Sequence, residues 1–375
     1  MSDYDVVVVG LGAMGSATAY QLALRGKRVL GIDAFPPGHT FGSSHGETRI
    51  IRMAYFEHPN YVPLLRRAYA LWKRLETDTG ASLLRITGGM LVGPADGDLV
   101  RGSIVSAQKY GLAHSVLDAD QIRKLYPVFS SRPDDVAFYE DVAGVLFPEK
   151  CISAHLGLAE QHGAVLRHAE PVKAIDADDD GEVAVRTSHG TYTAGHAVVT
   201  LGAWIQKLLP DVPVVAERIP LMWFEPLAHA DQFELGRFPI CIWHSPDLGD
   251  YYLTPHVAIP GVKIGKHHSG NVCDPATIDR TVSPSDERPL RTFLERHIPS
   301  LAGAVTNSAV CIYENSPDLH FLVDQRGALT IGAGFSGHGF KFASVIGELL
   351  AELATTGQTT PDADFLRLAR IASAH

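Results

Sequence analysis

The first apolar run along the chain is short and is bounded by polar and glycine residues. Residues 6–9 are four consecutive valines, as expected of a strand buried on both faces in a parallel sheet. A glycine-rich turn follows, and small and apolar residues then recur at helical spacing up to Gly26, which is placed to end a helix. Residues 28–32 predict the next strand. The order strand, helix, strand predicts a βαβ unit, because neighbouring parallel strands require such a crossover.

The middle of the chain has a different pattern. A longer helix is predicted where apolar residues from Leu64 to Leu75 share one face, with Gly80 just past its end. Beyond it, short segments alternate polar and apolar residues, which is typical of an antiparallel or mixed sheet. Residues 188–190 predict a hairpin turn. The strands predicted in this part are residues 90–92, 136–139, 183–187, 191–193, 214–224 and 262–265.

The C-terminal part returns to the pattern of the N-terminus. A strand is predicted over residues 329–331, followed by the glycine-rich loop 332–339 and a helix that Lys341 opens and Gly357 closes. We therefore predict an α/β fold in which a Rossmann-like nucleotide-binding domain is built from both ends of the chain. A substrate domain based on a mixed or antiparallel sheet would be inserted into it. The expected domains are residues 1–83, 148–218 and 320–375 for the first, and 84–147 and 219–319 for the second.

Composition and charge exclude several classes of protein. With 46% hydrophobic and 20% charged residues among 375, the chain is expected to be globular, with about two domains. A formal net charge of -10 makes nucleic acid and anionic membrane surfaces poor partners. The apolar runs are too short to cross a membrane, and the N-terminus lacks the basic segment of a signal peptide. The four cysteines form no zinc-site spacing. We expect a cytoplasmic protein without a metal.

The turn after the first strand carries the motif of a dinucleotide site. Gly10, Gly12 and Gly15 fit G-x-G-x-x-G, and Asp33 ends the second strand at the distance expected of a residue that holds a ribose. A preceding strand and a following helix, whose N-terminus attracts phosphates, strengthen this interpretation. The alternative is a glycine-rich turn in another α/β fold. The motif does not separate FAD from NAD. The glycine clusters at 201–204 and 332–339 favour FAD, because this long cofactor needs contacts from several segments.

Basic residues at helical or strand spacing are candidates for binding an anion. His45, Arg49 and Arg52 are spaced four and three apart, so a helix would place them on one face. A flavin and a substrate carboxylate would be suitable partners for that face, although spacing alone favours an ordinary solvated patch. Lys341 lies at a helix start, where lysine is disfavoured. Lys263 lies on a predicted strand, where most lysines are edge residues.

Three longer segments, residues 44–52, 309–313 and 334–342, make the whole chain resemble the monomeric sarcosine oxidase and N-methyltryptophan oxidase family. This family belongs to the D-amino-acid oxidase superfamily of flavoproteins. The resemblance implies an FAD bound covalently, through a thioether between a cysteine matching Cys311 and the flavin 8α-methyl group. Without it, a cysteine in an apolar stretch would be a buried structural residue. That interpretation is kept for Cys151, Cys241 and Cys273.

The resemblance also implies roles for single residues in the reaction. Arg52 would hold the substrate carboxylate with two hydrogen bonds, assisted by Lys341. Lys263 would promote electron transfer to oxygen. Further active-site positions implied by the family are His45 and Arg49 near the flavin ring, His267 and Tyr313 in the active site, and Tyr252 at the substrate. Cofactor contacts are expected at Gly10, Gly12, Gly15, Asp33, Ser43, Arg49, Val172, Gly202, Cys311, Gly337, Gly339 and Lys341.

The implied reaction is oxidation of an N-methyl amino acid by a monomeric enzyme. A hydride would pass to the flavin, oxygen would become hydrogen peroxide, and the imine would hydrolyse to an amino acid and formaldehyde. Met53 and the segments 240–244 and 251–255 depart from the family pattern, which leaves the substrate side chain open. Alternatives are an oxidase of pipecolate, glycine or a D-amino acid, and a dehydrogenase with another acceptor. Two further alternatives are an NAD-dependent dehydrogenase and a non-catalytic nucleotide-binding protein.

Overall fold

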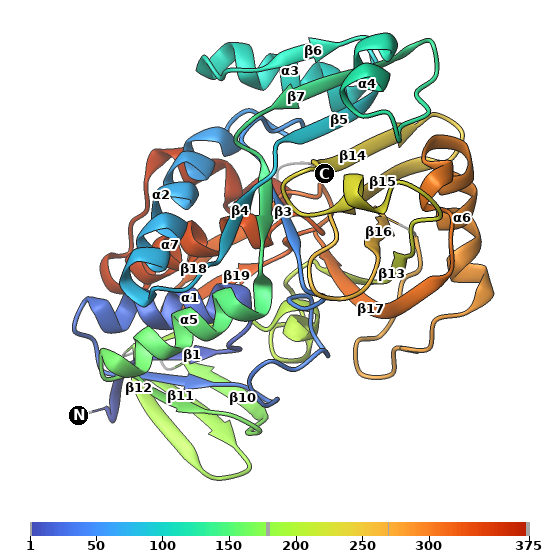
Figure 1. Cartoon of the computed structure of the whole chain (residues 1–375). Helices are drawn as coiled ribbons and strands as arrows, with labels where there is room; N and C mark the ends of the chain where they lie inside the picture. The colour runs from blue at the N-terminus through green and yellow to red at the C-terminus, as the bar shows by residue number, and fades with distance from the viewer. Residues whose placement is uncertain (1, 178–180, 269, 373–375) are drawn as a thin grey trace.

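The computed structural model describes residues 2–177, 181–268 and 270–372. Within these residues the chain forms two eight-stranded sheets and a three-stranded sheet. Figure 1 shows the first large sheet at the bottom of the molecule and the second to its upper right. None of the described helices combines the length and the apolar content needed to cross a membrane.

The first sheet contains the predicted βαβ unit. Strand β1 (Tyr4–Val9) pairs in parallel with β2 (Val29–Ile32) and β12 (Thr191–Val199). The four valines of β1 are almost wholly inaccessible to solvent, so the expectation of a strand covered on both faces is confirmed. The parallel part is completed by β9 (Val165–Arg167) and β19 (Leu329–Ala333), and its antiparallel margins are β10 (Val172–Ala177), β11 (Val183–Thr187) and β18 (Leu322–Arg326).

Helices cover one face of this sheet (Figure 1). Between β1 and β2 runs α1 (Ala13–Leu24), which contacts both α5 (Pro148–Gln161) and α7 (Ala343–Thr356). The approach of α1 and α7 is close, because a Cβ on Gly347 would lie 2.5 Å from that of Ala17. Helix α2 (Tyr61–Thr79) packs on α7. As predicted, left-handed glycines end α2 and α7, at Gly80 and Gly357.

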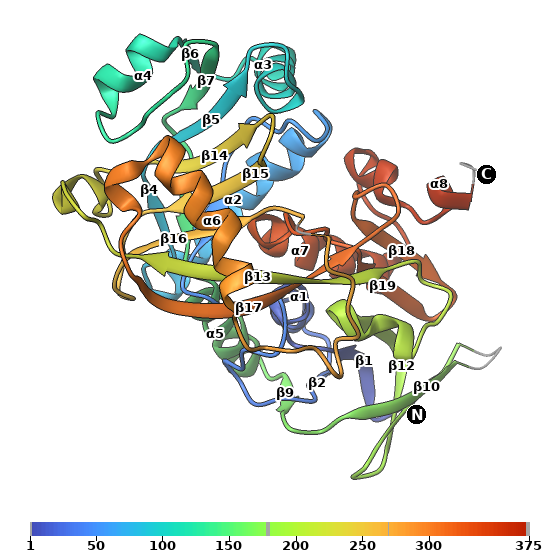
Figure 2. The ribbon, with the colours of Figure 1, turned by 90° about the vertical axis from the view of Figure 1, so that its right-hand side faces the viewer.

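The second sheet is antiparallel except where β14 meets β5. Figure 2 shows its long strands β13 and β17 running side by side across the middle of the molecule. Helix α6 (Pro284–His297) packs against it through Phe293, beside Trp243. In spatial order the strands are β17 (Val305–Asn315), β13 (Val215–Phe224), β16 (Val262–Lys266), β15 (Gly249–Thr254), β14 (Ile240–Ser245), β5 (Gly89–Pro94), β7 (Asp135–Glu140) and β6 (Ser115–Leu117).

The small sheet rules out the helical case in which the basic residues of segment 45–52 would share one face. Residues 45–52 are not helical: 45–48 form a loop, and Arg49–Ile51 is strand β3, paired with β8 (Gly144–Leu146), which also pairs with β4 (Leu84–Ile86). The backbone explains why no helix forms, because φ is +91° at Gly46 and +69° at Glu47, which a right-handed helix forbids. The Glu149 carboxylate accepts the N–H groups of both residues, at 2.8 and 3.2 Å, and thus satisfies the backbone of the loop.

The end of the glycine-rich loop 332–339 corrects one prediction. Lys341 lies in the short helical turn η4 (Phe340–Phe342), and α7 begins only at Ala343. The lysine therefore precedes the last helix instead of opening it. The remaining helical segments are α3 (Asp98–Tyr110), α4 (Ala119–Leu125), η1 (Gly202–Lys207), η2 (Ala230–Phe233), η3 (Pro299–Leu301), η5 (Pro361–Leu366) and α8 (Ala369–Ala372).

Candidate active site

A cavity of about 940 Å³ lies between the two large sheets. Its wall includes residues of β1, β2, β9, β10 and β19 on one side and of β14, β15, β16 and β17 on the other. Further wall residues come from the loop after β2, one face of α5, and segments 200–204 and 335–341. A cavity of this volume, lined by so many separate segments, suits an extended ligand with chemically different parts.

The glycine-rich turn forms one end of this cavity, and its three glycines have different tasks. A Cβ on Gly10 would lie 2.4 Å from the Thr200 carbonyl oxygen, and one on Gly15 only 1.7 Å from the Gly10 oxygen. These two glycines are therefore required by the packing of the protein itself. A Cβ on Gly12 would meet no atom of the described residues beyond its chain neighbours within 4 Å, and Gly12 has an ordinary φ of -66°. Because Gly12 lines the cavity at the N-terminus of α1, the free space there fits the phosphates of a dinucleotide.

Asp33 ties the end of β2 to this turn. Its Oδ2 accepts the Leu11 N–H at 2.7 Å, and its Oδ1 accepts the Phe35 N–H at 2.8 Å. Asp33 also lies on the cavity wall, and each carboxylate oxygen keeps acceptor capacity for a ribose hydroxyl. The residue thus stabilises the turn and faces the cavity at the same time.

Most of the other expected cofactor residues line the same cavity. Gly337 and Gly339 are needed for close packing, because added Cβ atoms would lie 2.3 Å from the Tyr313 ring and 2.4 Å from the Phe335 Cβ. Gly15 is not on the wall, so its role is to let α1 approach the turn. The expected residues that lie on the wall are Gly10, Gly12, Asp33, Ser43, Arg49, Val172, Gly202, Cys311, Gly337, Gly339 and Lys341.

Cys311 lies on β17, buried and on the cavity wall. Its Sγ is 3.6 Å from Arg49 Nη2 and 3.5 Å from the Ser43 carbonyl oxygen. The Arg49 guanidinium therefore contacts the sulfur directly, in the kind of electropositive setting that reactive cysteines occupy. Cys151 and Cys241 are buried away from the cavity, and burial raises the pKa of both thiols. Cys273 is partly exposed, so it was wrong to expect a buried residue there.

Lys263 is not an edge residue, because β16 pairs with β13 on one side and β15 on the other. Its side chain is 1% exposed and lies on the cavity wall. The Nζ donates to the carbonyl oxygens of Gly46 and Thr48, at 2.9 and 2.5 Å. Burial, and then the charge of Arg49, hold the pKa of Lys263 well below its usual value. An ammonium held by two carbonyls keeps one N–H for a ligand.

Three aromatic residues gather beside Lys263. His267 Nδ1 lies 3.1 Å from the Tyr313 hydroxyl, and Tyr252 packs against Gly265, where a Cβ would be 2.4 Å from its hydroxyl oxygen. All three aromatic side chains line the cavity. Burial lowers the pKa of His267 and raises the pKa of both tyrosines. They are therefore uncharged near neutral pH and can exchange hydrogen bonds with a substrate.

Arg52 and Lys341 are two buried cations on the same wall. The Arg52 guanidinium donates to both oxygens of Glu57, at 2.7 and 2.6 Å, and its Nε has no partner among the described residues. Lys341 Nζ donates to the His338 carbonyl oxygen at 2.7 Å and to the Tyr55 hydroxyl at 3.4 Å. Burial, and then Arg52, lower the pKa of Lys341 to about 7.

One expected residue lies apart from this site. His45 is 2% exposed, but it does not line the cavity. Burial, together with the charges of Arg49, Arg280 and Lys263, lowers its pKa to about 3. Its neutral ring therefore packs behind the wall, close enough to Arg49 and Lys263 for their charges to act on it.

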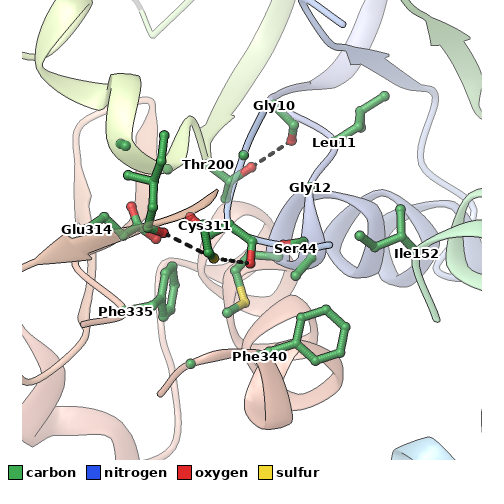
Figure 3. A pocket seen from close by; sticks show the side chains of 18 of the residues that line it. Gly10, Leu11, Gly12, Ser44, Ile152, Thr200, Cys311, Glu314, Phe335 and Phe340 are labelled. Carbon is green, nitrogen blue, oxygen red and sulfur yellow. Dashed lines mark hydrogen bonds between the residues drawn. The ribbon is translucent and has the colours of Figure 1, made fainter. Parts of the chain in front are cut away.

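Sequence reasoning missed several groups on or behind the wall. Glu57 follows Arg52 by five residues, and a search for an acidic partner could have found it. Tyr55 and His338 are 283 residues apart in the sequence, and the Tyr55 hydroxyl oxygen lies 2.6 Å from His338 Nδ1. No local pattern indicates this contact. Glu314 lies next to Tyr313; burial raises its pKa to about 8, and its Oε2 has no partner among the described residues. Figure 3 shows Glu314 and Cys311 on the pocket wall, both from β17.

The chain is similar to characterised proteins over nearly its whole length. A family model described as FAD dependent oxidoreductase matches residues 5–353. Monomeric sarcosine oxidase from Streptomyces avermitilis is 43% identical over 379 residues, covering 99% of this chain and 98% of that protein. N-methyl-L-tryptophan oxidase from Yersinia pestis is 35% identical over 373 residues, covering 98% and 99%. The solved structure of NikD, an unusual amino acid oxidase, matches with a TM-score of 0.84 at 24% identity and 98% coverage of each chain.

Proposed function

Because the chain belongs to the family of FAD-dependent oxidoreductases, we propose that it is an oxidase of N-methyl amino acids. Bound FAD supplies the acceptor for a hydride from the carbon beside the substrate nitrogen. The product is an imine, which water hydrolyses to an amino acid and formaldehyde when the N-methyl group is the carbon oxidised. Oxygen takes up the electrons and two protons to give hydrogen peroxide. We expect a monomer, as the Streptomyces relative is named.

The observation that carries the proposal is the pair of buried cations, Arg52 and Lys341, on the wall of the dinucleotide cavity. Glu57 already pairs with Arg52, so the donors left for a substrate carboxylate are the Arg52 Nε, unpartnered among the described residues, and the third N–H of the Lys341 ammonium. The nearby His267, Tyr252 and Tyr313 are neutral, so they suit the amine end of an amino acid. The chain thus binds and orients the substrate, and orientation is the main contribution that a protein makes to hydride transfer.

Lys263 has a separate role in the proposal. Its ammonium stabilises the negative charge that forms when an electron reaches oxygen. Two backbone carbonyls fix its position, so little reorganisation is needed when that charge appears. Because its pKa is lowered, oxygen reactivity is expected to fall as pH rises above that lowered pKa and the ammonium loses its proton.

The proposal is tested by a substrate panel with oxygen consumption, peroxide and formaldehyde measured together. Sarcosine, N-methyl-L-tryptophan and other N-methyl amino acids are compared with glycine, pipecolate and D-amino acids. Ile242, Tyr252 and Thr254 line the cavity in segments that differ from the family pattern, so the preferred side chain is read from the panel. Equal amounts of peroxide and formaldehyde from an N-methyl amino acid support the proposal. Turnover restricted to amines without an N-methyl group, or coupled only to an artificial acceptor, contradicts it.

We further propose that the flavin is bound covalently through Cys311. Acid precipitation of the wild-type protein should then leave the yellow colour in the pellet, whereas Cys311→Ala should release all of its flavin to the supernatant. Cys273→Ala is the matched control, because this cysteine is partly exposed and does not line the cavity. Flavin that is released from the wild type to the same extent as from Cys311→Ala would exclude the bond.

A further inference from the structure

Behind the two cations lies a hydrogen-bonded chain that runs from Leu319 through His338 and Tyr55 to Lys341. His338 Nε2 is 2.9 Å from the Leu319 carbonyl oxygen, and Nδ1 is 2.6 Å from the Tyr55 hydroxyl. The Tyr55 oxygen is in turn 3.4 Å from Lys341 Nζ. All of these side chains except that of Leu319, which contributes only its carbonyl, are buried. This series of hydrogen bonds connects the loop after β3 with the loop 332–339 and with η4.

Chemistry fixes the direction of each hydrogen bond in this chain. A carbonyl oxygen only accepts, so His338 must carry its proton on Nε2 and donate it to Leu319. Burial lowers the pKa of His338 well below its usual value, so the ring is neutral and Nδ1 can only accept. Tyr55 must therefore donate its hydroxyl hydrogen to His338 Nδ1. The hydroxyl oxygen is left with a lone pair for an N–H of Lys341.

The ring of Tyr55 contacts the other cation. The Arg52 guanidinium carbon lies 4.1 Å from the centre of the Tyr55 ring, within the range of a cation–π contact. One residue thus touches both Arg52 and Lys341, the first with its ring face and the second with its hydroxyl. Trp72 holds the Lys341 backbone from another side, because its Nε1 donates to the Lys341 carbonyl oxygen at 2.9 Å.

We propose that Tyr55, oriented by His338, is a positioning residue that holds Lys341 in place and in its ammonium form for the substrate carboxylate. The inference rests on the proposed function, because it assumes that Arg52 and Lys341 bind a carboxylate. It assigns Tyr55 and His338 no contact with the reacting atoms. The Tyr55 lone pair and the His338 carbonyl occupy two N–H groups of the ammonium, and the third stays free for the ligand.

The charge state of Lys341 depends on the groups that face it. Burial and Arg52 favour its neutral form, and Glu57 favours the ammonium. Tyr55 and His338 face it through hydrogen bonds, and its charge also acts on His267 at the end of β16. With a pKa of about 7, Lys341 is charged below neutral pH and loses its charge above it. Carboxylate affinity should therefore be high at low pH and fall to a plateau supported by Arg52 alone.

The test measures binding of propionate to the holoenzyme, followed by the change in its flavin spectrum, from about pH 6 to about pH 9. Propionate has no amine, so only protein groups titrate in this range. Removing one acceptor from the ammonium in Tyr55→Phe should lower the midpoint of the affinity change by about half a unit and weaken binding at the wild-type midpoint by about twofold. Phenylalanine keeps the ring over Arg52, so the plateau at high pH should not change.

Three further variants distinguish a failure of this inference from a failure of the proposed function. Tyr61→Phe removes a hydroxyl in the same aromatic cluster, where it contacts His320 and the Phe321 N–H but neither cation; its titration should match the wild type. His338→Leu removes the acceptor that orients the Tyr55 hydroxyl and should shift the midpoint as Tyr55→Phe does. If Tyr55→Phe does not fold, the midpoint measured for His338→Leu tests the inference in its place. Lys341→Met should abolish the pH dependence and leave only the plateau.

Each result has a definite meaning. Downward shifts in Tyr55→Phe or His338→Leu, with none in Tyr61→Phe, support the inference. If Lys341→Met removes the pH dependence but Tyr55→Phe and His338→Leu titrate like the wild type, Tyr55 does not position the lysine and the inference is wrong, while the proposed function stands. If the wild type and Lys341→Met bind propionate identically at every pH, the carboxylate site itself is wrong, and both proposals fail together.

Discussion

Replacing Lys263 with methionine should slow the reaction of the reduced enzyme with oxygen by about 10²–10³-fold, because one preorganised charge at the site of developing negative charge is lost. Anaerobic reduction of the flavin by the amino acid should change far less, since Lys263 lies beside the proposed substrate site without being one of its two carboxylate ligands. Stopped-flow spectroscopy measures the two half-reactions separately.

The control for this experiment is Lys266→Met, three residues along β16 and outside the cavity wall. Both of its half-reactions should match those of the wild type. An equal loss in the two half-reactions of Lys263→Met would mean that the lysine supports the architecture of the cavity. Unchanged reoxidation would remove Lys263 from the oxygen reaction altogether.

Gly15→Ala should yield a protein that neither retains FAD nor folds with wild-type stability. The new Cβ would lie 1.7 Å from the Gly10 oxygen and 2.6 Å from Thr200 Oγ1, and a backbone atom cannot move away as a flexible side chain can. Forced packing of this kind costs about 1–3 kcal/mol or more. Flavin content per protein and the thermal unfolding midpoint of the purified variant measure the two effects.

Gly12→Ala provides the contrast within the same turn. Its Cβ would lie more than 4 Å from the other described parts of the chain, so the apoprotein should unfold at the wild-type temperature. FAD affinity should nevertheless fall, because the methyl group enters the space available to the phosphates. If Gly12→Ala bound FAD as the wild type does, the diphosphate would have to lie elsewhere in the cavity.

Much of the fold is encoded in local patterns, and those predictions are confirmed. The buried run at residues 6–9, the motif glycines and Asp33 predict β1, α1 and β2 correctly, because each element is determined by residues close together in the chain. Left-handed glycines mark the ends of α2 and α7 for the same reason. The α/β class with a Rossmann-like part is confirmed as well. The division into domains stays a prediction.

The site shows where local patterns stop being informative. The spacing of His45, Arg49 and Arg52 is compatible with a helix, but Glu149, about 100 residues further on, holds Gly46 and Glu47 in a loop. The partners of Lys341 come from segments nearly 290 residues apart. Whether Lys263 is an edge or a central residue depends on which strands pair with β16. Each answer is a property of the tertiary structure, which a single sequence does not display.

The central claim is that this chain holds FAD and uses it to oxidise N-methyl amino acids. The most direct test is the visible spectrum of the purified protein, recorded without oxygen before and after addition of each N-methyl amino acid. We predict a flavin band that at least one of these substrates bleaches and that admitted air restores. A colourless protein that cannot take up FAD, or a flavin band that no N-methyl amino acid reduces, would contradict the account.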